Sequence, residues 1–178
     1  MNFEQLFKKI TPEEINDNVF TLVGEVFPVV TVGNKEKYNS MTASGGGFVM
    51  LFRKPATMLI MPQNRYTLEL IEKEERYTLS YFPDDYKKQV MFLGNKSGRD
   101  SNKMQEVELT GIELPSRNMS FEEARLIIEC KLIQITMPAF PNDFYSEEAV
   151  DYLSKPYEDQ GEHRKYIFGE ITNVWVKK

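Results

Sequence analysis

The chain has 178 residues, of which 41% are hydrophobic, and its formal net charge is -5. A chain of this size fits one domain that buries roughly 70% of its unfolded surface, and its negative charge argues against general nucleic-acid binding, which needs a positive footprint. One cysteine and one histidine are too few for a disulfide or a four-ligand zinc site. We therefore predict a single domain over residues 1–178 without a metal site.

The first ten residues mix charged side chains with isolated apolar ones. They lack the continuous apolar region of a secretory signal, and no apolar run in the chain is long enough to predict a transmembrane helix. We expect a cytoplasmic protein with no membrane partner.

The first half of the chain alternates β-like runs with turn signals. Runs rich in Val and aromatic residues predict strands, and Gly33-Asn34 predicts a turn between two of them. A break over Thr42–Gly47 follows, because small residues and three glycines replace the β-like pattern. After a short N-terminal helix, the predicted strands cover residues 20–24, 27–32, 37–42 and 57–61.

The second half contains the longest predicted strands, at residues 76–82, 126–137 and 167–176. Residues 126–133 alternate in the manner of a half-buried strand. Helices are predicted at 67–73, 84–93 (followed by Gly94 as its C′ residue) and 146–153, and Ser120-x-x-Glu123 predicts a capping box. Because strands and helices do not alternate regularly, we predict a curled antiparallel sheet or barrel.

Three short polar segments carry the chemistry that suits a phosphorylated ligand. They are Asn39-Ser40-Met41-Thr42-Ala43-Ser44, Arg65-Tyr66-Thr67, and Ser97-Gly98-Arg99-Asp100 followed by Lys103. The first ends a strand with small residues that let a ligand approach the backbone. The second opens a helix for which Asn64 is the predicted cap, so a guanidinium, a hydroxyl and the helix dipole converge there.

The third segment offers a guanidinium fork at Arg99 and a point charge at Lys103, and both suit phosphate. It is not a Walker A loop, because Asn95 separates Gly94 from Lys96, and Gly45–Met50 fails the dinucleotide fingerprint. Each segment taken singly also fits an ordinary surface turn or capped helix. His163 lies in a charged turn that fits solvent exposure, and Cys130 on an apolar strand face fits the core.

Taken in order, these segments resemble the flavin reductase-like family of FMN-binding split barrels, particularly its flavoredoxin-like branch. The resemblance covers most of the chain. It rests on Tyr38–Ser44, Lys54-Pro55, Pro62–Thr67, Ser97–Asp100 with Lys103, and Gly169–Ile171.

The resemblance implies a mainly β fold: a six-stranded antiparallel Greek-key split barrel with short flanking helices, assembled as a homodimer with FMN near the interface. It implies that the first segment lines the isoalloxazine ring and ribityl chain, and that the other two hold the phosphate and part of the ribityl chain. The predicted cofactor-binding residues are Asn39, Ser40, Met41, Thr42, Ala43, Ser44, Arg65, Tyr66, Thr67, Ser97, Gly98, Arg99 and Lys103.

Two positions depart from the family pattern. Relatives often carry a Trp where this chain has Gly45, which predicts a more open pocket. Relatives also tend to have a His where this chain has Arg164, with His163 one position earlier. No catalytic residue is therefore assigned.

The resemblance leaves three functions to separate. The first is an FMN-dependent oxidoreductase that takes electrons from NADH, NADPH or another donor and passes them to a small acceptor. The second is an FMN-containing electron carrier that docks a redox protein and turns over no nicotinamide. The third is a split-barrel binding module for another ligand, such as haem, with His163 as the axial ligand.

Overall fold

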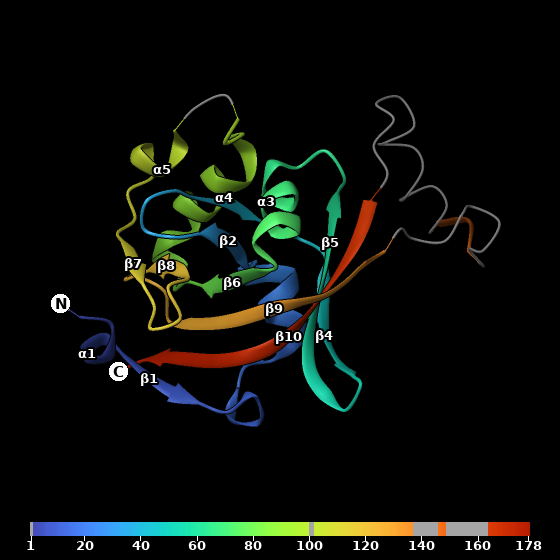
Figure 1. Ribbon diagram of the computed structural model, residues 1–178, viewed down its shortest axis with the longest axis horizontal. Helices are drawn as coiled ribbons and strands as arrows, with labels where there is room; N and C mark the ends of the chain where they lie inside the picture. The colour runs from blue at the N-terminus through green and yellow to red at the C-terminus, as the bar shows by residue number, and fades with distance from the viewer. Residues whose placement is uncertain (1, 100–101, 137–145, 149–163) are drawn as a thin grey trace.

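The computed structural model describes residues 2–99, 102–136, 146–148 and 164–178. A strongly curved antiparallel sheet dominates it, and helices gather over one end of that sheet (Figure 1). The sheet contains eight strands, namely β1 (Phe7–Ile10), β2 (Val29–Gly33), β3 (Tyr38–Thr42), β4 (Gly46–Leu51), β5 (Lys54–Pro62), β6 (Arg76–Tyr81), β9 (Leu126–Thr136) and β10 (Arg164–Lys177).

The strands follow the order β3-β2-β6-β9-β10-β5-β4, and β1 pairs with β10. The mainly β class and the antiparallel pairing are as predicted, but the sheet has eight strands where six were expected. The length of β10 accounts for part of this difference, because its first half pairs with β5 from Arg164 to Glu170 and its last residues pair with β1. The sheet thus divides along β10 into two branches.

Short helices and a small second sheet surround the main sheet. The helical elements are α1 (Phe3–Leu6), η1 (Pro12–Glu14), α2 (Val19–Thr21), η2 (Leu22–Val26), α3 (Tyr66–Glu74), η3 (Asp84–Tyr86), α4 (Lys87–Asn95) and α5 (Lys103–Glu106). The second sheet pairs β7 (Gly111–Glu113) with β8 (Met119–Phe121). No helix in the described ranges is long and apolar enough to cross a membrane.

Two apolar clusters cover the two faces of the sheet. Val30, Tyr77 and Ile128 belong to the cluster enclosed by the curved strands. Phe82 and Phe121 belong to the other, which also holds side chains of α1 and α4. Because side chains on both faces are buried, Leu126 to Cys130 are buried at every position, and the half-buried pattern predicted for this strand is wrong.

A buried polar group lies inside the first cluster. The Tyr77 hydroxyl lies 2.9 Å from Thr57 Oγ1, which in turn lies 3.3 Å from Cys130 Sγ. Burial raises the pKa of the Cys130 thiol to about 12, so this thiol is an unreactive core group, as the sequence predicted. Gly169 is required beside it, because an added Cβ would lie 2.3 Å from the Tyr77 hydroxyl.

The turn at Gly33-Asn34 is confirmed, and the break predicted over Thr42–Gly47 is wrong at its end. Gly33 has a φ of 118° in the hairpin between β2 and β3. Gly46 already belongs to β4 and pairs with β5, where an added Cβ would lie 2.0 Å from Met58 O. The glycine therefore serves a close strand approach rather than a loop.

The strand predicted over residues 20–24 is wrong, since these residues form α2 and η2. Asn18 starts this helical stretch: its side-chain oxygen accepts hydrogen bonds from Phe20 N at 2.9 Å and Thr21 N at 3.2 Å. Such a cap satisfies two otherwise free donors, and this local effect outweighs the β propensity of the sequence.

Three smaller predictions also need correction or lie outside the structure. Ser120 belongs to β8 and its hydroxyl bonds Ser80, so there is no capping box. Gly94 lies inside α4, one residue before its end, rather than after it. Residues 149–153 of the helix predicted at 146–153 lie outside the described residues.

Candidate functional site

The three polar segments of the sequence converge at the end of the sheet covered by α3, α4 and α5 (Figure 1). Asn39 Nδ2 on β3 donates to Thr67 Oγ1 on α3 at 2.8 Å. Gly98 lies so close to the same amide that an added Cβ would be 2.0 Å from Asn39 Oδ1. The Thr42 hydroxyl donates to Val90 O of α4. These contacts bring the segments together, as the sequence predicted.

One cavity lies beside the turn between β3 and β4, and we call it the β5 cavity. Its volume is about 490 Å³. It is lined by Phe27, Met41, Thr42, Ala43, Ser44, Gly45, Ile60, Met61, Pro62, Arg65, Met91, Gly94, Asn95, Arg164 and Tyr166.

The β5 cavity combines apolar walls with positive charge. Its lining includes two guanidinium groups, Arg65 and Arg164, and no carboxylate from the described part of the chain. The backbone of β10 places Arg164 opposite Pro62 and Tyr166 opposite Ile60, so these four residues follow one face of the paired strands. A flat apolar molecule with an anionic group matches this lining.

A second cavity of about 1140 Å³ lies between the β2–β3 hairpin and α5, and we call it the α5 cavity. It is more polar than the first. It is lined by Val32, Gly33, Asn34, Glu36, Lys37, Tyr38, Asn39, Tyr66, Leu70, Lys73, Glu74, Gly98, Arg99, Asn102, Lys103, Met104 and Gln105.

The structure divides the predicted residues between these cavities. The β5 cavity receives Met41, Thr42, Ala43, Ser44 and Arg65, whereas the α5 cavity receives Asn39, Tyr66, Gly98, Arg99 and Lys103.

The remaining predicted residues, Ser40, Thr67 and Ser97, line neither cavity and hold neighbouring groups. The Ser40 hydroxyl is buried against Thr31 Oγ1 at 2.8 Å. Thr67 accepts from Asn39, and Ser97 Oγ accepts from Arg99 N at 3.2 Å. In the geometry described here these three hydroxyls position the segments.

Lys103 is a buried cation that lines the α5 cavity. Its ammonium donates to Leu93 O at 2.9 Å and to Lys96 O at 2.6 Å, and the residue is 2% exposed. These carbonyls belong to the C-terminal end of α4, where a cation is favourable. Burial, and secondarily the positive charge of Arg65, lower the pKa of Lys103 to about 8.

Arg99 differs from Lys103 because it already has an anionic partner. It forms an ion pair with Glu69, and its Nη2 also donates to Asn64 O at 3.3 Å. Its guanidinium lies 5.4 Å from the centre of the Tyr66 ring. The prediction that Asn64 caps α3 is wrong, because Arg65 occupies the N-cap position and forms no side-chain cap bond.

Sequence reasoning missed the contribution of α4 and assigned no role to β10. Met91, Gly94 and Asn95 lie on one side of α4 and line the β5 cavity. Their spacing of three and four residues is the signal that could have identified this face. Gly94 also lets α4 approach β3, since an added Cβ would lie 3.2 Å from Thr42 Cβ. His163 lies outside the described residues.

Comparisons with known proteins agree with this fold and place the chain in a family. Residues 22–178 match the model of the flavin reductase like domain. Among solved structures, an FMN-binding protein from Thermus thermophilus with bound 1-cyclohex-2-enone superposes with a TM-score of 0.65 at 21% identity, over 95% of this chain and 77% of that one.

Two further structures show the same architecture. The flavoredoxin of Desulfovibrio vulgaris (Miyazaki F) has a TM-score of 0.65 at 17% identity, over 94% of this chain and 76% of its own. A split barrel domain protein from Shewanella frigidimarina has a TM-score of 0.63 at 18% identity, over 85% of this chain and 66% of its own. No curated protein sequence matches the chain.

The fold is thus that of the split-barrel flavoproteins, which confirms the predicted fold class. The chain belongs to the flavin reductase-like family.

Proposed function

We propose that this protein is an FMN-binding oxidoreductase that takes electrons from a reduced nicotinamide or another donor and passes them to a small acceptor. The observation that carries the proposal is the β5 cavity, whose described lining is mainly apolar, contains two arginines and includes no carboxylate. FMN combines a flat aromatic ring with a phosphate, and this lining offers a match for both parts. Family membership supports the same ligand.

The described residues fit FMN in distinct ways. The segment Met41–Ser44 and the facing side chains Ile60 and Tyr166 offer a surface for the ring. Arg65 is exposed at the start of α3 and offers its guanidinium to the phosphate. Lys103 adds a second positive charge near Arg65.

The protein's own contribution is to bind and orient the cofactor, which supplies hydride acceptance and electron transfer when bound. Gly45 carries no side chain over the cavity and Met91 beside it is 44% exposed. At Gly45 a donor therefore meets no side chain that it would have to displace. We expect a nicotinamide donor to bind transiently over the exposed face of the flavin.

The first experiment is a visible absorption spectrum of the protein before and after adding FMN, and then NADH or NADPH without oxygen. We expect a flavin spectrum that bleaches with nicotinamide. A protein that stays colourless with FMN would refute the proposed ligand.

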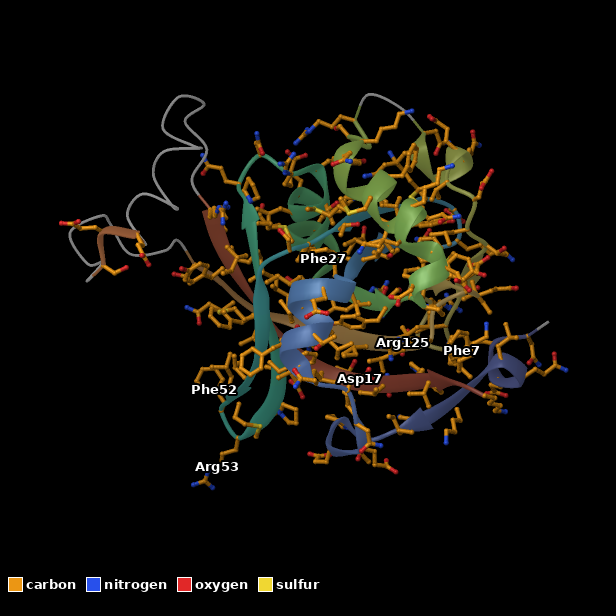
Figure 2. The ribbon with its side chains drawn as sticks, turned by 180° about the vertical axis from the view of Figure 1, so that it is seen from behind. Phe7, Asp17, Phe27, Phe52, Arg53 and Arg125 are labelled. Carbon is orange, nitrogen blue, oxygen red and sulfur yellow. The ribbon has the colours of Figure 1, made fainter. Side chains whose placement is uncertain are left out.

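An Arg65→Gln variant tests the phosphate assignment. We expect its FMN affinity to fall at least tenfold while its riboflavin affinity changes less than twofold, because riboflavin lacks the phosphate. Arg53→Gln is the matched control, since Arg53 lies at the tip of the β4–β5 hairpin (Figure 2) and does not line the cavity. Equal losses for FMN and riboflavin would refute the assignment.

A flavoredoxin-like electron carrier is the alternative function, and the open cavity beside Gly45 favours it because a redox protein could approach the flavin there. Stopped-flow mixing of the FMN-loaded protein with NADH and NADPH separates the two. A carrier stays oxidised with both, whereas the proposed oxidoreductase is reduced by at least one donor.

We also propose that two copies of the chain associate through an apolar surface made by α2 and the β4–β5 hairpin. Phe20 is 82% exposed, Met50 66% and Phe52 77%, and large exposed apolar side chains of this kind mark association surfaces. Light scattering after gel filtration should show a dimer that Phe52→Asp converts to a monomer. A wild-type monomer would refute this proposal.

A further inference from the structure

Phe27 has a backbone conformation that residues other than glycine rarely adopt. Its φ is 62° and its ψ is 122°, whereas the left-handed region open to other residues has a ψ of about 47°. Glu75 at the end of α3 illustrates the tolerated case, with a φ of 53° and a ψ of 22°. Phe27 is therefore strained, although glycine tolerates a positive φ better than any other residue.

Two backbone hydrogen bonds hold Phe27 in this conformation. Its N–H ends the π-helical turn η2 by donating to Leu22 O at 3.1 Å, and such turns occur frequently at functional sites. The carbonyl of the next residue, Pro28, accepts a hydrogen bond from Ala43 N at 2.9 Å, which extends the pairing of β2 with β3. Phe27 is thus fixed beside the turn between β3 and β4 at the end of η2 (Figure 2).

Phe27 belongs both to the core and to the lining of the β5 cavity. It packs against the apolar cluster that includes Val90 and Leu93 of α4, and it lines the cavity together with Met91 of the same helix. Among the described non-glycine residues with a positive φ, Phe27 alone lines this cavity. Strained residues gather at ligand sites, where the surrounding structure holds them, so the strain at Phe27 points to a ligand contact.

We propose that Phe27 packs against the ring of the bound flavin, and that its strained backbone serves this contact. The inference rests on the proposed function and deepens it, because it identifies a residue that selects a flat aromatic ligand. The described lining of the cavity contains one other aromatic residue, Tyr166. Aromatic pairs are stabilising beyond the area that they bury, so Phe27 provides affinity for the ring that does not depend on the phosphate.

The test compares Phe27→Leu with Phe92→Leu by isothermal titration calorimetry of FMN, riboflavin and lumiflavin, which has the ring but neither ribityl chain nor phosphate. Phe92 is the matched control, because it packs against the same apolar cluster and lines neither cavity. Phe27→Leu should weaken the binding of all three flavins by the same factor, about fivefold. Phe27→Tyr and Phe92→Leu should bind them like the wild type.

A fluorescence measurement reports the contact itself. An indole that touches a flavin quenches its fluorescence by electron transfer, and Tyr166→Phe removes the quenching by the tyrosine already in the cavity. In that background Phe27→Trp should lower the fluorescence of bound FMN, whereas Phe92→Trp should not. A residue that served only core packing would give no such difference.

Two further variants separate the backbone of Phe27 from its side chain. Phe27→Gly and Phe27→Ala both remove the ring, but only glycine relieves the strain of a positive φ. Without ligand, Phe27→Gly should therefore unfold at a higher urea concentration than Phe27→Ala. The reverse order would refute the strain.

The flavin contact can fail while the proposed function stands. If the wild type binds FMN but Phe27→Leu binds lumiflavin equally well, or if Phe27→Trp leaves the bound FMN unquenched, the inference is overturned. A wild-type protein that binds neither FMN nor lumiflavin would instead refute the proposed function.

Discussion

Two buried charges in this protein have opposite environments. Glu129, on β9, is 1% exposed and Lys103, on α5, is 2% exposed. The Glu129 carboxylate accepts hydrogen bonds from Trp175 Nε1 at 2.7 Å, from Asn118 Nδ2 at 2.9 Å and from Ser116 Oγ. Lys103 donates to two carbonyls and has another cation, Arg65, as its charged neighbour.

The different environments of Glu129 and Lys103 indicate different roles: Glu129 stabilises the fold, whereas Lys103 binds a ligand. Three donors satisfy Glu129 fully within the protein, so its carboxylate links β9, β10 and the turn before β8. Lys103 keeps an excess of positive charge together with Arg65, and an anion would remove it. We therefore expect changes at Glu129 to alter stability and changes at Lys103 to alter ligand binding.

The largest effect should come from Glu129→Ala. Removal of the Glu129 carboxylate leaves the indole N–H of Trp175 and the amide of Asn118 without their acceptor. Each buried unsatisfied donor costs about 1–3 kcal/mol. We expect a loss of about 3 kcal/mol in the free energy of unfolding, measured by urea denaturation. Glu113→Ala on β7, where the carboxylate is exposed, is the control.

The same variant must retain the binding properties of the wild type. Glu129 lines neither the β5 nor the α5 cavity, so the folded variant should bind FMN within twofold of the wild type. A large loss of FMN affinity with unchanged stability would reverse the roles that we assign to the two charges.

Lys103→Met gives the converse test. The variant removes an ammonium that burial and Arg65 both disfavour, and this gain offsets the loss of two hydrogen bonds to α4. We expect the free energy of unfolding to change by less than about 1 kcal/mol, while FMN affinity falls at least tenfold and riboflavin affinity stays within twofold. Lys88→Met, which changes an exposed lysine of α4, is the control.

The pH dependence of binding follows from the pKa of Lys103, which is lowered to about 8 in the free protein. Below this value the side chain is charged and attracts the phosphate. Above it the side chain is neutral, so binding must take up a proton, and affinity falls. We expect FMN affinity to drop about tenfold from pH 7 to pH 9, with a smaller change for riboflavin.

The free energy of unfolding depends on pH in the opposite direction: it rises with pH, whereas FMN affinity falls. An ammonium whose pKa is lowered on folding opposes the folded state while it is charged. This penalty is fully present below pH 8 and is relieved as the pH rises from about 8 towards the ordinary value of 10.5. Lys103→Met should abolish both pH effects. A pH dependence that survives in this variant would assign them to another group.

The sequence predicted that the three polar segments come together, but not the geometry in which they do so. Arg65, Arg99 and Lys103 were predicted to be phosphate ligands because their side chains and their positions near helix ends are local properties. The bonds of Lys103 to Leu93 O and Lys96 O depend on how α4 ends and how the chain returns to α5. No pattern in a short segment encodes that contact.

The fold shows the same limit. Strands β2, β3, β5, β6, β9 and β10 follow from local composition and alternation. Strand β4 could not be predicted in this way, because Gly46 and Gly47 weaken its β signal and its pairing with β5 stabilises it. The two cavities were unpredictable for the same reason, since α4 and β10 complete the β5 cavity from distant parts of the chain.

The smallest effect should come from Arg99→Gln. Its guanidinium already pairs with Glu69, donates to Asn64 O and lies over the Tyr66 ring. A phosphate must compete with these partners, and exposed ion pairs contribute only about 0.2–1 kcal/mol. We therefore expect FMN affinity to fall twofold to threefold and the free energy of unfolding to decrease by about 0.5 kcal/mol.

A double-mutant cycle with Glu69→Gln separates the two uses of Arg99. If Glu69 restrains the guanidinium, Glu69→Gln alone should raise FMN affinity about twofold, and this gain should vanish when Arg99 is also replaced. A tenfold loss in Arg99→Gln would place Arg99 beside Arg65 and Lys103 among the main phosphate ligands. The presence of an anionic partner, such as Glu69 beside Arg99, would then not indicate which cations bind the ligand.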